Sequence, residues 1–303
     1  MSTLAERFAD AEYAAAWRLV RGLPAPLARG AFGLGADLGA RRGGPGVRRL
    51  RANLARVVPD AGPAELDALV RAGMRSYARY WCEMFRLRAG DGPRVRAYMD
   101  RHMTGTSPFF EALAAGRGVV FAVPHSGNWD AAGLWVTETL RGMGREPAFT
   151  TVVQRLRPES LYRRFVEFRE ALGFEVVAAE DGSAGYRALT RRLRAGGVVC
   201  LVADRDVTAA GVDVSFFGER ASFPTGPARL AALTGALLMP AYPHFTPDGW
   251  TAPIADPVPV ADRGSVPKAT QAVADAFAGL IASAPADWHA LQPIWTADRP
   301  GLP

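Results

Sequence analysis

The chain has 303 residues, of which 49% are hydrophobic and 22% charged, as expected for a globular protein with a sizeable core. The net charge is +6, and arginine carries almost all of the positive charge because Lys268 is the only lysine. Arginine favours phosphate groups. The composition argues against a membrane-spanning helix, which needs about 18 uninterrupted apolar residues, and the first residues do not have the layout of a signal peptide. We therefore expect a protein of the cytoplasm, in solution or on a membrane surface.

Residues 4–57 are predicted to be mostly helical, with a break near Pro24. Residues 1–57 combine aromatic and apolar side chains with a dense group of arginines. This combination suits amphipathic helices that lie on an anionic bilayer, and it equally suits helices that pack on the protein with their arginines in water. In the first case, the residues expected to associate with the membrane are Tyr13, Trp17, Arg48, Arg49 and Arg51.

The next segments lead into a buried strand. Apolar residues at helical spacing predict a helix over 63–88, and a second, short helix is predicted over 107–115. Residues 94–103 between them are expected to be a connector. The run Val119–Val123 is uniformly apolar and rich in β-branched residues, and it predicts a central strand.

The stretch 118–133, GVVFAVPHSGNWDAAG, contains the strongest candidate for catalysis. A strand ends at Pro124, a turn carries His125, and a helix opens at Trp129, so the histidine lies where open α/β sheets bind ligands. Asp130 falls in the first helical turn. It could accept from Nδ1 of His125, fix the tautomer and leave Nε2 free to take a proton. The alternative is a structural histidine at the start of the helix.

Strands and helices then alternate, which predicts an α/β fold with a central, mostly parallel sheet flanked by helices. Further strands are expected at 148–153, 174–177, 198–203, 239–245 and 254–260, a short strand or flap over 212–217, and helices over 155–172, 186–194, 227–234 and 267–283. No linker or repeat divides the chain. We expect one domain, 1–303, with its catalytic α/β core in 104–260.

Two other groups of residues belong to the candidate site. Asp204, Arg205 and Asp206 follow the strand at 198–203, in the topological position that His125 has after its own strand. The helix over 155–172 carries Arg164 and Arg169, and at least one of them is expected to contact a phosphate or the reacting groups. The alternative for these arginines is a solvated helix face.

The sequence predicts neither a metal site nor a cofactor. The four histidines have no ligand spacing, and Cys82 and Cys200 are far apart in sequence and form no metal motif. Residues 181–185, DGSAG, miss the serine hydrolase pattern G-x-S-x-G at their first position.

Several separated blocks resemble the bacterial membrane acyltransferases of the lipid A lauroyl-acyltransferase type, and most of all the actinobacterial branch that acylates phosphatidylinositol mannosides. The blocks are PHSGNWDAAG at 124–133, RLRPESLYRRFVEFREALGFEV at 155–176, ADRDVTAAGVDVSFFGE at 203–219, FPTGPARLAALTGA at 223–236 and PADWHALQPIW at 285–295. AAAWRLVRGLP near the start adds to them. The resemblance thus covers nearly the whole chain.

The resemblance implies a glycerolipid-acyltransferase-like α/β core and a role for each matching residue. His125 would be the general base, Asp130 its orienting partner, and Asp204 a further acidic group near the histidine, where family members can carry Glu. Arg169 matches a family arginine beside the active site. The residues expected to bind substrate are Ser126, Asn128, Arg164, Arg169, Arg205 and Asp206.

The implied reaction transfers a fatty acyl chain, expected to be palmitoyl, from acyl-CoA to a mannose hydroxyl of a phosphatidylinositol mannoside. Acyl-CoA would be a co-substrate, and no cofactor or metal would be needed. The enzyme would be peripheral, at the cytoplasmic face of the cell membrane, with an anionic membrane surface as a partner. The alternatives are the same chemistry on another glycolipid, such as a lipid A precursor with an acyl-carrier-protein donor, and a non-catalytic lipid-binding protein. Nucleic acid is a disfavoured partner, because the arginines are dispersed and no binding motif accompanies them.

Overall fold

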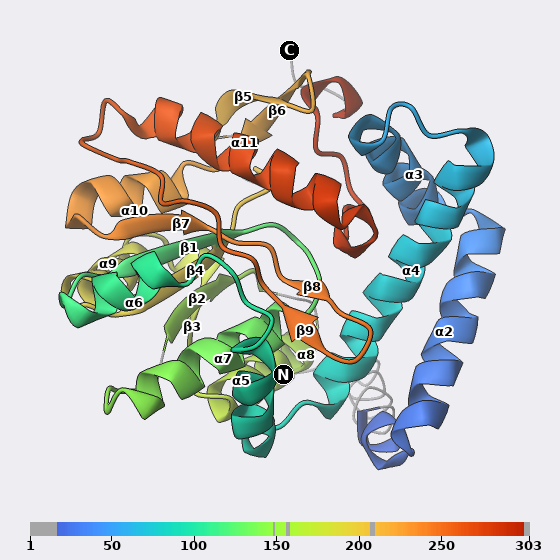
Figure 1. Ribbon diagram of the computed structural model, residues 1–303. Coiled ribbons are helices and arrows are strands. Elements are labelled where there is room, and N and C mark those ends of the chain that lie inside the picture. Colours follow the sequence, from blue (N-terminus) through green and yellow to red (C-terminus); the bar gives the residue numbers. More distant parts are fainter. Residues whose placement is uncertain (1–16, 148, 156–157, 207–209, 300–303) are drawn as a thin grey trace.

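The computed structural model describes residues 17–147, 149–155, 158–206 and 210–299 (Figure 1). A five-stranded sheet of order β3-β2-β4-β1-β7 forms the centre, and all its pairings are parallel. Its strands are β1 (Val119–Val123), β2 (Phe149–Val153), β3 (Phe174–Ala178), β4 (Val198–Val202) and β7 (Leu237–Pro240). Two small antiparallel pairs are β5 (Val212–Phe216) with β6 (Glu219–Phe223), and β8 (His244–Phe245) with β9 (Trp250–Thr251).

Helices cover both faces of the sheet and one of its sides (Figure 1). They are α2 (Ala25–Arg42), α3 (Pro45–Val57), α4 (Pro63–Arg86), α5 (Gly92–Met99), α6 (Ser107–Ala114), α7 (Trp129–Gly142), α8 (Glu159–Ala171), α9 (Gly182–Arg194), α10 (Gly226–Thr234) and α11 (Val266–Ser283). Short 3-10 turns occupy Ala89–Asp91, Ala179–Asp181, Pro285–Asp287 and Thr296–Asp298.

The uniformly apolar sequence of β1 follows from burial on both faces. Val119, Phe121 and Val123 pack in the cluster that includes α7, whereas Val120 and Ala122 pack in the cluster that includes α9, α10 and α11. Successive side chains of a strand point to opposite faces, so a strand between two helical layers needs apolar residues at every position. All five residues of β1 are buried. The expected α/β fold is confirmed.

The N-terminal helices α2, α3 and α4 stand together at one side of the sheet (right in Figure 1). The C-terminal segment of the chain joins these three helices to the core. Trp288 and Trp295 are fully buried, and the side chain of Asn53 in α3 donates to the carbonyls of Ala290 and Gln292. Among the described residues, no helix has the length and apolar character needed to cross a membrane.

Most predicted elements are confirmed to within a few residues, and three expectations are corrected. Residues 92–99 form helix α5 instead of a connector, because Val95 and Met99 lie one turn apart and are both buried. Residues 239–245 are divided between β7 and β8. Residues 254–260 make only isolated bridges, since Pro257 and Pro259 have no N–H to donate to a ladder.

Candidate active site

His125 lies at the carboxyl end of β1 and faces Asp204 at the carboxyl end of β4. β1 and β4 are neighbours in the sheet, and Val123 pairs with Val202 in register. His125 lies two positions after Val123, and Asp204 lies two positions after Val202. The parallel register therefore brings the two side chains together. The distance from Nδ1 of His125 to Oδ1 of Asp204 is 2.7 Å.

The Asp204 carboxylate is a buried anion held by three hydrogen bonds. Besides the contact with Nδ1, Oδ2 accepts from the backbone N–H of His125 and from Nε1 of Trp288, both at 3.0 Å. Burial alone would raise the pKa of Asp204. The positive charge of His125 and the hydrogen bonds from His125 and Trp288 outweigh it and hold that pKa below its ordinary value.

A charged carboxylate at Nδ1 fixes the tautomer of His125. The carboxylate can only accept, so the neutral imidazole carries its proton on Nδ1 and leaves Nε2 as an acceptor. The His125 side chain is 49% exposed and has no second hydrogen-bond partner among the described residues. The arrangement suits a general base that takes a proton from a bound hydroxyl.

The imidazole opens onto a pocket of about 250 Å³. Aromatic side chains of α4, among them Tyr77, Tyr80 and Trp81, form one wall, and Trp129 at the start of α7 forms another. The other lining residues are Ser126, Asp204, Arg205, His289, Ala290, Leu291, Gln292 and Ile294. The pocket thus combines aromatic and apolar side chains with polar and charged groups that could orient a bound substrate.

The predicted contact between His125 and Asp130 is wrong. Asp130 is fully buried, and its carboxylate binds Nε of Arg169 at 3.0 Å and the hydroxyl of Tyr80 at 3.2 Å. It points from α7 toward α4 and α8, whereas Nδ1 of His125 points toward β4. Asp130 thus contacts Tyr80, which lines the pocket, and Arg169, whose guanidinium lies 4.3 Å from the ring centre of Trp129.

Replacing Arg169 with Ala is expected to lower the free energy of unfolding by about 3–5 kcal/mol, because the Asp130 carboxylate would stay buried without its ion-pair partner. The charge of Asp130 holds the pKa of Arg169 above its ordinary value against the effect of burial, so the guanidinium stays charged at neutral pH. Activity should fall as well, since Trp129 and Tyr80 lose their support. Urea denaturation and acyl-transfer rates measure the two effects.

The matched control is Arg163→Ala, on the exposed face of the same helix. It should change stability by no more than about 0.5 kcal/mol. Equal, small effects of the two substitutions would contradict the positioning role of Arg169.

Asn128 and Ser126 are buried beside His125, and both are engaged by the protein. Asn128 caps α7, accepting from the backbone N–H of Ala131 through its side-chain oxygen and donating to Glu83 through its side-chain nitrogen. Asn128 is not among the residues that line the pocket. The Ser126 hydroxyl donates to the carbonyl of Pro124 at 3.4 Å, and Ser126 lines the pocket.

Three other predicted substrate-binding residues lie in different places. Arg205 lines the pocket beside His125. Arg164 lines a separate hollow with Trp17, between the N-terminal segment, the end of α4 and α8. Asp206 is buried, and its carboxylate accepts from the Gly211 N–H and the Ser222 hydroxyl, so it anchors the β5–β6 hairpin. The structure thus brings Arg205 to His125 and leaves the other two outside the pocket.

The segment after α11 supplies pocket residues that local sequence reasoning did not single out. The backbone N–H of His289 donates to the carbonyl of His125 at 2.8 Å, and its ring lies beside Tyr77 and Tyr80. Nε2 of His289 is 2.9 Å from the Ser76 hydroxyl, which donates to Asp287. The block at 285–295 belonged to the family resemblance, but no residue spacing linked it to His125.

The stability of the protein is expected to fall as the pH drops from 6.5 to about 5, by at most about 1.4 kcal/mol per pH unit from His289. Burial, followed by the charge of His125, lowers the pKa of His289 from 6.5 to about 3, with Asp204 opposing. The unfolded chain therefore binds this proton over a range where the folded chain does not. The measurement is the free energy of unfolding against pH.

The variant His289→Gln should show a flatter profile over this range than the unmodified protein. Burial raises the pKa of the nearby Asp287, which acts in the opposite direction in both proteins and so cancels in the comparison. Identical profiles would mean that His289 titrates normally in the folded chain.

The residues predicted to associate with a membrane are engaged within the molecule where the structure describes them. Tyr13 lies outside the described residues. Trp17 packs edge-on against Phe85, with ring centres 4.9 Å apart. Arg49 pairs with Asp298 at 2.8 Å, Arg51 pairs with Asp67, and Arg48 donates to the carbonyl of Gly43. These contacts favour packing as the function of these side chains.

The part of the chain that the structure describes contains no cluster of three or more His, Cys, Asp or Glu side chains placed to hold a metal ion.

Comparison with known proteins identifies the family. The family model described as bacterial lipid A biosynthesis acyltransferase matches residues 3–297. A phosphatidylinositol mannoside acyltransferase from Mycolicibacterium smegmatis is 50% identical over 291 residues, which cover 95% of this chain and 92% of the relative. The protein of the same name from Mycobacterium tuberculosis is 47% identical over 298 residues, covering 98% and 92%. This chain therefore belongs to the bacterial lipid A biosynthesis acyltransferase family and is an acyltransferase.

Proposed function

We propose that the enzyme transfers a palmitoyl chain from acyl-CoA to a mannose hydroxyl of a phosphatidylinositol mannoside, at the cytoplasmic face of the cell membrane. His125 acts as general base, and Asp204 orients it. The observation that carries the mechanism is the 2.7 Å contact between the two side chains at the mouth of an aromatic pocket. The names of the relatives support the acceptor.

In the proposed reaction, the sugar hydroxyl oxygen attacks the thioester carbonyl carbon while Nε2 of His125 takes the hydroxyl proton. The tetrahedral intermediate collapses, the carbon–sulfur bond breaks, and the thiolate leaves and is protonated by the imidazolium. General-base assistance of this kind contributes about 10²–10⁴ to the rate. The buried Asp204 carboxylate stabilises the imidazolium formed on the way.

Negative charge develops on the carbonyl oxygen in the intermediate, and Arg205 is the cationic side chain that lines the pocket. Burial and, to a smaller extent, the charge of Arg299 lower the pKa of Arg205, and the charge of Asp204 opposes them. The pKa of a guanidinium lies so far above 7 that Arg205 stays charged. Arg205 can therefore favour the oxyanion electrostatically.

An apolar hollow of about 30 Å³ lies behind the pocket, and Trp129 borders both spaces. Gly133 borders the hollow as well, and a Cβ at this position would come within 2.5 Å of the ring of Phe149. The lining is almost entirely hydrophobic, from Met103, Phe121 and Ile254 among others. We propose that the acyl chain enters past Trp129, with side chains moving to widen the space.

The test is incubation of the purified protein with labelled palmitoyl-CoA or palmitoyl acyl-carrier protein, and with either a phosphatidylinositol mannoside or a lipid A precursor as acceptor. We expect the unmodified protein to form labelled phosphatidylinositol mannoside from the CoA donor. A His125 variant should form none of this product. Transfer only to the lipid A precursor would show that the acceptor is not a phosphatidylinositol mannoside. Lipid binding without any labelled product would indicate a lipid-binding protein.

Membrane association is proposed to involve α2. Leu27, Leu34 and Leu38 are 63%, 68% and 49% exposed, and spacings of seven and four residues place them on one face of the helix. Such a stripe is suited to insert between lipid headgroups.

The variant Leu34→Gln/Leu38→Gln is expected to bind vesicles containing phosphatidylinositol more weakly, by up to about 1.5–3 kcal/mol for each leucine lost. Co-sedimentation measures the binding. Phe110→Gln/Met143→Gln, which removes exposed apolar side chains from α6 and the end of α7, should leave binding unchanged. An equal loss of vesicle binding in both double variants would show that α2 does not contact the membrane.

A further inference from the structure

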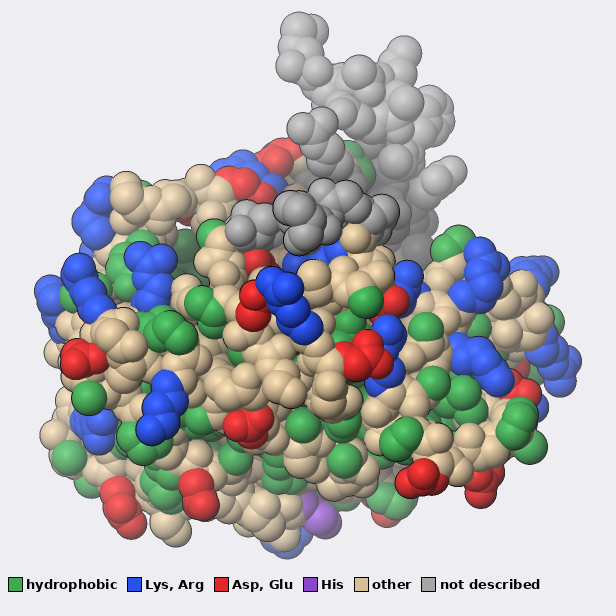
Figure 2. Space-filling view, turned by 90° about the horizontal axis from the view of Figure 1, so that it is seen from above, with side chains coloured by type: hydrophobic (Ala, Val, Ile, Leu, Met, Phe, Trp, Pro, Cys, Tyr) green, Lys and Arg blue, Asp and Glu red, His purple; other side chains and the backbone are tan. Residues whose placement is uncertain are grey.

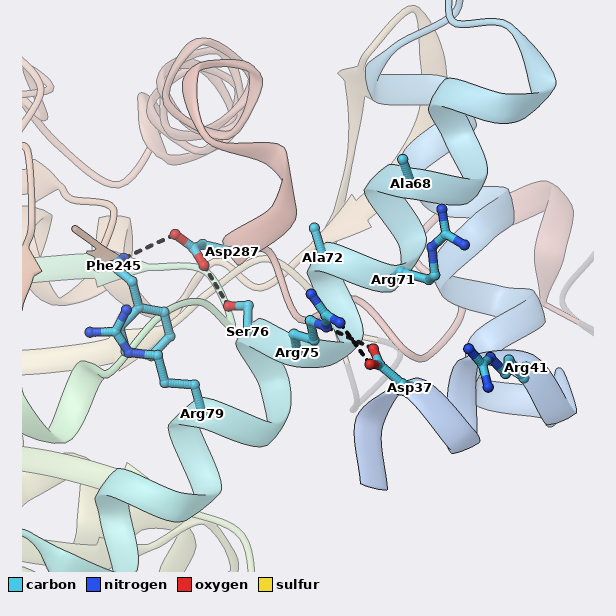
Figure 3. Close-up of a pocket in the computed structure, with 10 residues that line it drawn as sticks. All are labelled: Asp37, Arg41, Ala68, Arg71, Ala72, Arg75, Ser76, Arg79, Phe245 and Asp287. Carbon is cyan, nitrogen blue, oxygen red and sulfur yellow. Dashed lines mark hydrogen bonds and ion pairs between the residues drawn. The ribbon is translucent and has the colours of Figure 1, made fainter. Parts of the chain in front are cut away.

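A second, strongly basic groove lies between α2 and α4, and it uses other residues of α4 than the pocket of His125 does. Its volume is about 640 Å³. Figure 3 shows Arg71 and Arg75 from α4 beside Arg41 from the last turn of α2, with Asp37 between the helices. Ala68 and Ala72 line the same wall, and their small side chains leave the groove open.

The groove carries more positive charge than its own acids neutralise. Four arginines line it, against the two carboxylates of Asp37 and Asp287. Arg79 is already engaged through Nε, Nη1 and Nη2, because it pairs with Glu83 and donates to the carbonyls of Thr246 and Gly249.

Arg75 is only half used. Its Nε and Nη2 donate to the two carboxylate oxygens of Asp37, both at 2.7 Å, and Nη1 has no partner among the described residues. Arg41 and Arg71 are exposed and make no hydrogen bond or ion pair with any described residue. Hydrogen bonds from Arg75, and further the charges of Arg75, Arg41 and Arg71, hold the pKa of Asp37 below its ordinary value. Three guanidinium groups with free donors thus converge on one space.

We propose that this groove binds the phosphate of an anionic phospholipid headgroup, through Arg41, Arg71 and the free donors of Arg75. Planar guanidinium groups bind phosphate oxygens in pairs and are preferred at such sites. On the face in Figure 2, by contrast, arginines are interspersed with acidic and apolar side chains.

The neighbouring surface favours a lipid over a soluble phosphate. Leu38 lies one turn before Arg41 on α2 and is 49% exposed, and it ends the leucine stripe that begins at Leu27. A lipid with its chains along the stripe would place its headgroup at the arginines. The phosphates of a thioester carrier are less well placed, because the pocket of His125 uses Tyr77, Tyr80 and Trp81 on another face of α4.

The experiment compares binding of the full-length protein to phosphatidylcholine vesicles with and without phosphatidylinositol. The variant Arg41→Gln/Arg71→Gln should bind the phosphatidylinositol vesicles about thirtyfold more weakly, at roughly fivefold for each charge near an anionic surface. Asp37→Asn should act in the opposite direction, because it releases the donors of Arg75. Binding to pure phosphatidylcholine should not change in any variant.

The matched control is Arg42→Gln/Arg229→Gln, which removes two exposed arginines that do not line the groove. A loss as large as that of Arg41→Gln/Arg71→Gln would show a general effect of charge and overturn the site. A competition assay identifies the source of the phosphate. Soluble glycerophosphoinositol should displace the protein from the vesicles. Displacement by coenzyme A alone would assign the groove to the acyl carrier and overturn the proposed lipid site.

This site is independent of the transfer reaction, because the binding assay requires no turnover. His125-dependent hydrolysis of a soluble thioester should be the same in Arg41→Gln/Arg71→Gln as in the unmodified protein, which also shows that the variant is folded. Loss of hydrolysis in the His125 variant tests the proposed function separately, whatever the vesicles show.

Discussion

Replacing His125 with Ala is expected to abolish acyl transfer and to preserve the fold. The imidazole is half exposed at the end of β1, so its removal leaves no large cavity in the core. Its loss takes away the general base, which should lower kcat by about 10²–10⁴. The measurement is kcat with palmitoyl-CoA and a phosphatidylinositol mannoside, together with the thermal unfolding midpoint.

His102→Ala is the matched control, because His102 is exposed, stacks on Tyr98 and has no carboxylate partner among the described residues. It should keep full activity. If His125→Ala retained as much as about a tenth of kcat, the base would have to be a different group.

Asp204→Asn is expected to reduce kcat by a comparable factor, about 10²–10⁴, through loss of the fixed tautomer. Asp204 is the acceptor in all three of its hydrogen bonds, from Nδ1 of His125, the backbone N–H of His125 and Nε1 of Trp288. An amide offers only one oxygen to accept from them, and its NH₂ group would face a donor. The imidazole then turns or changes tautomer, and Nε2 is no longer the acceptor.

The Asp204 variant should also be less stable at neutral pH. A folded-state pKa below the ordinary value means that the charged carboxylate stabilises the fold above the ordinary pKa, and that this contribution is lost as the pH falls through the lower, folded value. Asn lacks the contribution at every pH, so the stability difference between the two proteins should shrink in acid.

Two companion variants separate positioning of His125 from general loss of structure. Asp204→Glu keeps the carboxylate and the charge, so it should recover part of the activity. Asp206→Asn removes a buried carboxylate two residues away that holds the β5–β6 hairpin, so it should lower stability without a comparable loss of kcat. A fully active Asp204→Asn protein would show that His125 needs no carboxylate.

The sequence by itself predicted most of the elements and placed His125 at the end of a strand. The uniformly apolar run Val119–Val123 marks a buried strand, the turn after Pro124 presents His125, and a helix opens at Trp129. These features depend on interactions within a few residues, so local patterns are sufficient to find them. The helix α5 was missed because its apolar positions, Val95 and Met99, are few.

Only the tertiary structure decided which carboxylate serves His125. Asp130 is five residues away in sequence, yet the direction of α7 turns it toward Arg169. Asp204 is 79 residues away, yet β4 lies beside β1 in a register that places it against Nδ1. The order of strands in a sheet is set by the packing of distant helices on its two faces, and no local spacing encodes it. For the same reason the sequence could identify the histidine at a strand end but not the strand next to it.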